Sequence, residues 1–215
     1  MLTFQAVTME LLVFILGLIL LLAKLVAKKG ASLPYGWITV IGFVIIGVVG
    51  VIYPPEVGIV FNGMYYTDSY SLFFKELILV CAVLVSLCSC DYVKKKGYHE
   101  AEYYILLVFA TLGMMVFTSA GDLITLYVGL ELMTMSFIVL IGLARRNALS
   151  TEASLKYLVL SALSSAVMLY GISMIYGFMG TTMFLQMAMN ISAFSHTAFM
   201  VVGVLFFLAG FAYKL

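Results

Sequence analysis

Three charged residues stand in apolar surroundings where they could do chemistry. Glu131 lies in LITLYVGLELMTMSFIVLIGLA, where no other charged residue occurs within eight positions. Lys156 lies in STEASLKYLVL and Lys214 in VVGVLFFLAGFAYKL. A charge near the centre of a bilayer costs about 2.5–3.5 kcal/mol on insertion scales, so it needs a partner or a function. Because a carboxylate and a lysine shift each other's pKa, changing their contact can capture or release a proton. These residue types therefore indicate proton handling.

Each of the three has a structural alternative. Glu131 comes about eight residues after the start of its apolar run, roughly 12 Å along a helix, which is too deep for a short side chain to reach water. It is the strongest functional candidate, and the alternative is a neutral, hydrogen-bonded structural acid. From the residues alone, Lys214 is a lysine that reaches the cytoplasmic interface. Glu152 precedes Lys156 by four residues, which favours a helical ion pair. Lys156 is therefore either a paired helix start or a lysine that faces the interior.

The elements that must position these residues are membrane spans. The chain has 215 residues, of which 65% are hydrophobic and 10% charged, whereas soluble domains carry about 25% charged residues. At roughly 20 apolar residues per span, this composition fills about seven spans. A net charge of +1 provides no field for nucleic acid. Metal-ligand spacing and Gly-rich phosphate loops are absent from the sequence, so we expect no metal or cofactor site in this chain.

Apolar runs predict an all-α, polytopic transmembrane helix bundle that forms a single membrane domain over residues 1–215. Backbone groups in hydrocarbon must be satisfied internally, and the runs lack the alternation of a β-barrel. The runs cover about 11–27, 36–53, 72–90, 103–120, 123–144, 155–178 and 197–215. The first run lacks a cleavage pattern and is interpreted as a retained span.

Loop charges predict the orientation. Lys and Arg occur in the first, third and fifth connections and are missing from the second, fourth and sixth. By the positive-inside rule this alternation places the N-terminus outside. The basic residues of these connections are Lys28 and Lys29, Lys94, Lys95 and Lys96, and Arg145 and Arg146.

Helix starts and interfacial charges complete the prediction. Asp122 directly precedes the fifth run and is expected to be its N-cap, and Ser150 or Thr151 could cap the sixth. The lysine triplet at 94–96 is interpreted as part of a solvated loop. Asp68 is expected to lie in an outer loop, and three charges near span ends are expected to reach the interface: Lys24, Lys75 and Glu76. All four are expected to be structural.

A specific family resemblance adds to this reading. DLITLYVGLELMTMSFIVLIGLARR, then STEASLKYLVLSALSSAVMLYGISMIYGFMGTT, then LFFLAGFAYKL resemble the N subunit of proton-translocating NADH:quinone oxidoreductase, respiratory complex I. This subunit belongs to the antiporter-like membrane proteins. The resemblance implies that Glu131, Lys156 and Lys214 are proton-path residues. It also implies that Lys214 ends an interrupted helix near mid-membrane and faces Glu131.

The resemblance carries further implications. The chain would be a proton-translocating subunit of a translocase, coupled to quinone reduction elsewhere in a complex of the cell inner (plasma) membrane. It would hold no redox centre, with quinone, FMN and iron–sulfur clusters bound by partner subunits. Its partners would be other membrane subunits and the lipid bilayer. Members of the family have about fourteen spans in inverted repeats, so this chain resembles the N-terminal half and lacks the second repeat.

Other functions remain open from the sequence. The nearest alternative is a subunit of a cation/proton antiporter or of a membrane-bound hydrogenase. A retinal photoreceptor would also use a lysine in its last span, but Trp37 is the sole tryptophan and the third run has no acid at mid-depth. A purely structural membrane anchor is the remaining alternative.

Overall fold

The computed structural model describes residues 5–27, 33–194 and 198–214, and the side chains of 191–194 are outside that description. The ordered elements are α2 (Thr8–Val26), α3 (Tyr35–Ile52), β1 (Gly58–Val60), a 3₁₀ turn (Phe61–Gly63), β2 (Tyr65–Thr67), α4 (Ser69–Lys96), α5 (Glu100–Thr118), α6 (Leu123–Ile141), α7 (Ala148–Met179), α8 (Phe184–Phe194) and α9 (Ala198–Lys214).

The described residues form a bundle of long apolar helices, which confirms the predicted fold class. Helices α2 to α7 are each long and apolar enough to cross a membrane. The seventh apolar run forms α9, which at 17 residues is shorter than a full span. The bundle therefore has six full-length candidate spans and one short apolar helix.

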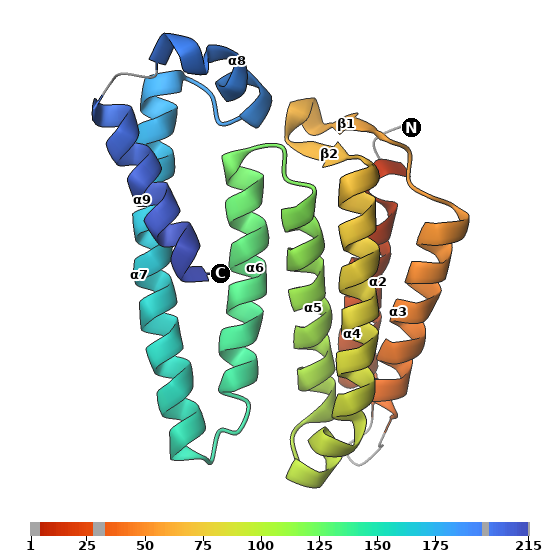
Figure 1. The fold of residues 1–215 in the computed structure, drawn as a ribbon. Helices are drawn as coiled ribbons and strands as arrows, with labels where there is room; N and C mark the ends of the chain where they lie inside the picture. Colours follow the sequence, from red (N-terminus) through yellow and green to blue (C-terminus); the bar gives the residue numbers. More distant parts are fainter. Residues whose placement is uncertain (1–4, 28–32, 195–197, 215) are drawn as a thin grey trace.

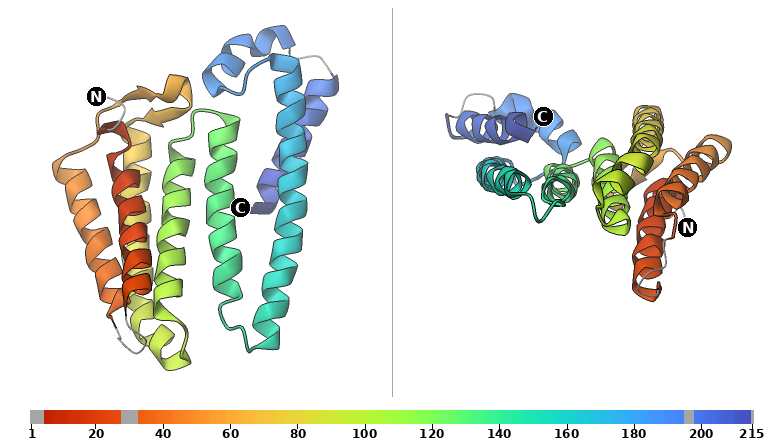
Figure 2. Two further views of the ribbon diagram at one scale, coloured as in Figure 1. Left: turned by 180° about the vertical axis from the view of Figure 1, so that it is seen from behind. Right: turned by 90° about the horizontal axis from the view of Figure 1, so that it is seen from below.

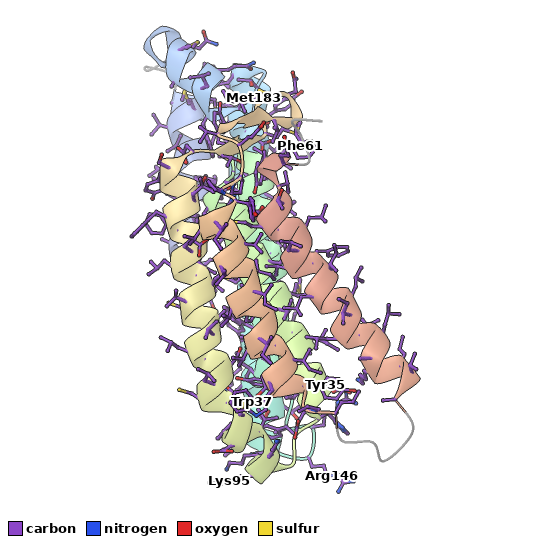
Figure 3. All side chains as sticks on the ribbon, turned by 90° about the vertical axis from the view of Figure 1, so that its right-hand side faces the viewer. Tyr35, Trp37, Phe61, Lys95, Arg146 and Met183 are labelled. Atoms are coloured by element: carbon purple, nitrogen blue, oxygen red, sulfur yellow. The ribbon has the colours of Figure 1, made fainter. Side chains whose placement is uncertain are left out.

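The two ends of the bundle differ in charge and in architecture. Lys95 and Arg146 lie at one end, and Phe61 and Met183 lie at the other (Figure 3). The described N-terminal end of α2, the β1–β2 hairpin and α8 lie at the end opposite the basic residues (Figure 1). We call the basic end the inner end and the hairpin end the outer end, following the loop-charge prediction. Lys28 and Lys29 are outside the described residues.

Two apolar cores divide the bundle. The first lies among α2 to α5, and its centre includes Val13, Phe43 and Val108, each fully buried. The second lies among α6, α7 and α9 and includes Leu130 and Met168. Helices α5 and α6 run side by side and join the two halves (Figures 1 and 2). The residues of the functional site belong to the second half.

Two helix boundaries differ from the sequence prediction. Lys94, Lys95 and Lys96 are not in a loop: they form the last turn of α4, which Gly97 ends with φ +65°. Cations are favourable at a helix C-terminus, and glycine adopts the left-handed conformation there without strain. The predicted cap at Ser150 or Thr151 is also wrong. Helix α7 starts earlier, and its N-cap is Asn147, whose side chain accepts the N–H of Leu149.

An outer cap of short segments, which the sequence did not predict, joins the two halves of the bundle. Strands β1 and β2 pair antiparallel, and the Tyr66 N–H donates to the Ser119 carbonyl over 2.8 Å. The Gly121 N–H donates to Met64 over 2.7 Å, and the Leu123 N–H donates to Thr182 over 3.1 Å. The cap therefore fixes the outer start of α6.

Asp122 is the predicted N-cap of α6, and the structure confirms this role. Its carboxylate accepts the Thr125 N–H over 2.9 Å and the Thr182 hydroxyl over 3.2 Å, and the residue is fully buried. We expect Asp122→Ala to lower the free energy of unfolding by about 1–2 kcal/mol, at the upper end for N-caps, because two donors lose their acceptor. Thermal unfolding in detergent measures the loss. Asn147→Ala, at an exposed cap, is the control, and equal losses in both variants would contradict the role of burial.

Candidate functional site

The site lies between α9 and α6, at the level of Lys214. The C-terminal end of α9 lies beside α6 and α7, about midway along them (Figure 1). There the Lys214 ammonium forms an ion pair with Glu131 Oε1. The Lys214 side chain is 1% exposed and that of Glu131 is 18% exposed. The interpretation of Lys214 as an interfacial lysine is therefore wrong, because its ammonium is buried inside the bundle beside Glu131 of α6.

Two further side chains contact the ion pair. The Ser165 hydroxyl of α7 hydrogen-bonds to Glu131 Oε1, and the Lys214 ammonium lies 5.6 Å from the ring centroid of Tyr127. Tyr127 precedes Glu131 by four residues and so shares its helix face. Desolvation of two charges is expensive, but their attraction and these polar contacts offset it. The arrangement holds a charged pair at membrane depth.

Close packing of α7 against α9 sets the position of Lys214. A Cβ on Gly210 would lie 2.6 Å from Met168 Cβ, and a Cβ on Gly171 would lie 2.4 Å from the backbone nitrogen of Phe207. Small residues allow such close approach of helices in membranes. The Ser164 hydroxyl also donates to the Gly210 carbonyl over 2.7 Å. Since Lys214 lies one turn after Gly210, this contact fixes the ammonium beside α6.

A partly open cavity reaches Glu131 from one side. Its volume is about 280 Å³, which is enough for several water molecules. Its polar lining comes from Tyr127, Glu131, Ser161 and Ser165. The Ser161 hydroxyl has no hydrogen-bond partner among the described residues. A cavity of this size with several polar groups can hold water in contact with Glu131.

Lys156 lies apart from this pair. Its ammonium is 2.5 Å from Glu152 Oε1 on the surface of α7, and the two side chains are 71% and 57% exposed. Lys156 precedes Ser165 by nine residues, roughly 14 Å along the helix axis. The structure therefore brings Glu131 and Lys214 together. Lys156 instead forms the ion pair with Glu152 that was one of its two predicted arrangements.

A second buried ion pair lies at the outer end of the first half. Lys75 Nζ of α4 is 2.8 Å from Glu10 Oε1 of α2, and their side chains are 0% and 4% exposed. The prediction that Lys75 reaches the interface is wrong, because the hairpin covers it and Tyr65 of β2 accepts its hydrogen bond over 3.1 Å. Lys24 forms an ion pair with Glu102 at 2.8 Å.

The sequence pointed to the ion pair of Glu131 and Lys214 but not to the residues that surround it. Tyr127 could have been found from its four-residue spacing to Glu131, and Ser165 from its place on a serine-rich face of α7 with Ser161. Lys75 and Glu10 carried no such signal, because they are 65 positions apart and only the tertiary fold joins them.

Comparisons with a family model and with solved structures indicate the class of membrane protein that this chain resembles. Residues 120–215 match the family model described as NADH:quinone oxidoreductase/Mrp antiporter, transmembrane. The structure is similar to a chain of respiratory complex I from Thermus thermophilus, with a TM-score of 0.73 and 23% identity, covering 95% of this chain and 43% of that one. It is also similar to a chain of an archaeal membrane-bound sulfane sulfur reductase, with a TM-score of 0.81 and 23% identity, covering 96% and 44%. Residues 120–215 therefore resemble this family of membrane proteins, and the two solved structures show that the chain shares the fold of such subunits.

Curated relatives indicate which subunit of such complexes the chain resembles. NADH-quinone oxidoreductase subunit N of Desulforamulus reducens is 41% identical over 212 residues, which is 99% of this chain and 44% of the relative. The subunit N of Moorella thermoacetica is 46% identical over 157 residues, covering 73% and 33%. The resemblance to subunit N is therefore confirmed. The chain spans less than half the length of these relatives.

Proposed function

We propose that the chain is a proton-translocating membrane subunit of an NADH:quinone oxidoreductase complex, and acts as part of a translocase. The observation that carries the proposal is the buried ion pair between Lys214 of α9 and Glu131 of α6. The similarity to subunit N supports the assignment to this kind of complex. The chain would form one membrane domain over residues 1–215, corresponding to the first repeat of the family.

The pair converts a movement into a change of protonation. While Glu131 contacts Lys214, the carboxylate stabilises the ammonium form of the lysine. If α9 moves and the pair opens, Lys214 loses its counter-charge in a low-dielectric site and releases its proton. Glu131, which lines the cavity beside α7, is then the group that water can reach. In this mechanism Lys214 and Lys156 carry the proton, and Glu131 modulates Lys214.

The driving force would come from elsewhere in the assembly. Quinone reduction, FMN and the iron–sulfur clusters would belong to partner subunits, and this chain would contribute charge movement only. Its partners would be other membrane subunits and lipid, in the cell inner (plasma) membrane. The likeness to chains of multi-subunit respiratory complexes supports the requirement for partners.

A second candidate is a subunit of a cation/proton antiporter or of a membrane-bound hydrogenase. One observation favours it: the matching family model names the Mrp antiporter together with the oxidoreductase. Purification of the tagged protein in mild detergent separates the two. Copurified flavin and iron–sulfur subunits support the oxidoreductase, whereas rescue of sodium-sensitive cells by the gene without such subunits supports the antiporter and contradicts the first proposal.

The assigned role of Lys156 gives a separate prediction. We expect Lys156→Ala to change the free energy of unfolding by at most about 0.5 kcal/mol, because its pair with Glu152 is exposed. We nevertheless expect it to slow proton translocation severalfold in the intact membrane protein, since it removes a proton carrier.

The matched control is Lys24→Ala, which also removes a lysine from a partly exposed ion pair. Both variants are assayed for proton uptake in proteoliposomes. If Lys156→Ala translocates protons as fast as Lys24→Ala, Lys156 is a structural residue of the helix start.

A further inference from the structure

A buried group of three titratable residues lies outside the Glu131–Lys214 site. Glu10 of α2, Lys75 of α4 and Tyr65 of β2 meet below the outer cap, and their residues are 3%, 0% and 5% exposed. We call these three residues the outer cluster. Lys75 Nζ lies 2.8 Å from Glu10 Oε1 and donates a hydrogen bond to Tyr65 OH over 3.1 Å.

The outer cluster repeats the chemistry of the first site. In both places a buried lysine pairs with a glutamate and lies over a tyrosine ring, at 5.1 Å for Lys75 over Tyr65 and 5.6 Å for Lys214 over Tyr127. The two sites lie in different halves of the bundle and share no residue. The same arrangement therefore occurs twice in one chain.

The contacts of Glu10 leave room for a second proton in the outer cluster. A buried carboxylate is stabilised when several donors reach its two oxygens. Here neither oxygen of Glu10 accepts a hydrogen bond of good geometry from the described residues, although Lys75 Nζ lies 2.8 Å from Oε1 and the Tyr65 hydroxyl interacts with the carboxylate. A proton on Oε2 would neutralise the carboxylate, so that it no longer needs several donors, and Lys75 would keep its hydrogen bond to Tyr65.

The surroundings leave Glu10 and Lys75 as the groups that exchange the proton. Burial, together with the negative charge of Glu10, raises the pKa of Tyr65 well above its usual range. The phenol therefore stays neutral, and it also interacts with the side chain of Ser119 in the outer cap. Glu76 faces α3 instead, where a Cβ on Gly50 would lie 2.3 Å from its Oε1. The nearby carboxylates at the outer end are engaged as N-caps: Asp68 of α4 and Asp122 of α6.

We propose that the outer cluster is a second proton-binding site, in which Glu10 takes up a proton from the outer aqueous phase and thereby releases Lys75 from its ion pair. In the ionised state the site holds one proton on Lys75, and in the loaded state it holds a second on Glu10. This deepens the proposed function, since it adds a proton site on the outer side. Its test measures proton binding and needs no translocation, so the two proposals fail independently.

Infrared difference spectroscopy after a pH step tests the proposal on the membrane protein purified with the subunits that accompany it. The C=O stretch of a protonated carboxylic acid is separate from that of a carboxylate. We expect a titrating acid band in the wild type that disappears in Glu10→Gln and remains in the control Glu102→Gln. In Lys75→Met the acid band should persist to higher pH, because the cation that favours the carboxylate is gone.

A double variant keeps the test informative if single substitutions unfold the protein. Glu10→Gln with Lys75→Met removes both charges and leaves no unpaired ion in the bundle. We expect its spectrum to lack the same acid band. If the spectrum of the folded double variant equals that of the wild type at every pH, Glu10 never binds a proton and the outer cluster is only a structural clamp.

Discussion

Glu131→Leu is expected to lower the free energy of unfolding by about 3–5 kcal/mol, because it leaves the Lys214 ammonium buried without a counter-charge. The Lys214 side chain is 1% exposed, and its remaining neighbour is the Tyr127 ring. Lys214→Met should cost less, about 1–3 kcal/mol. Glu131 then keeps the Ser165 hydrogen bond, faces the cavity and can be neutralised by a proton.

A double-mutant cycle measures this asymmetry. Thermal unfolding in one detergent compares the two single variants with Glu131→Leu/Lys214→Met, which should recover much of the stability that Glu131→Leu loses. Additive losses in the double variant would show that the two side chains do not interact, and would contradict the ion pair.

Gly210→Leu is expected to displace α9 and to separate Lys214 from Glu131. A side chain at position 210 meets Met168 Cβ at 2.6 Å and the Ser164 carbonyl at 2.7 Å, both parts of α7 that cannot move aside. Overpacking of this kind costs about 1–3 kcal/mol, and the hydrogen bond from Ser164 is lost as well. Proton translocation should fall as far as in a variant that lacks the ion pair.

Hydrogen exchange of the α9 amides reports the displacement. Gly177→Leu is the matched control, since this glycine is exposed on α7 and a Cβ there meets no atom within 4 Å. We expect faster exchange in α9 for Gly210→Leu and no change for Gly177→Leu. Unchanged α9 exchange in Gly210→Leu would contradict the role of the glycine contact in positioning Lys214.

The fold could be predicted from the sequence because hydrocarbon leaves few alternatives. Each predicted apolar run became a helix, and the charge alternation placed the basic residues at one end of the bundle. The short segments were harder. The β1–β2 hairpin and α8 lie in connections that have no long apolar run, and backbone hydrogen bonds to distant segments hold the hairpin.

The candidate site shows a similar division. Glu131 was identified because an isolated charge in an apolar run is expensive, whereas the place of Lys214 required the family resemblance. Its position depends on how closely α9 packs against α7 at Gly210 and Gly171, and composition does not encode that packing. Lys75 was misplaced for the same reason: a lysine near a span end reaches water unless another segment covers it, and here the hairpin does.

The most direct test of the central claim is the initial rate of proton translocation by the intact membrane protein, with Glu131→Gln and Lys214→Ala measured beside the wild type. Assembly with partner subunits is checked in the same preparations. The account predicts that both variants assemble and that translocation falls by about tenfold or more, equivalent to at least ~1.4 kcal/mol in the barrier. Wild-type rates in both variants would contradict the assignment of proton translocation to the Glu131–Lys214 pair.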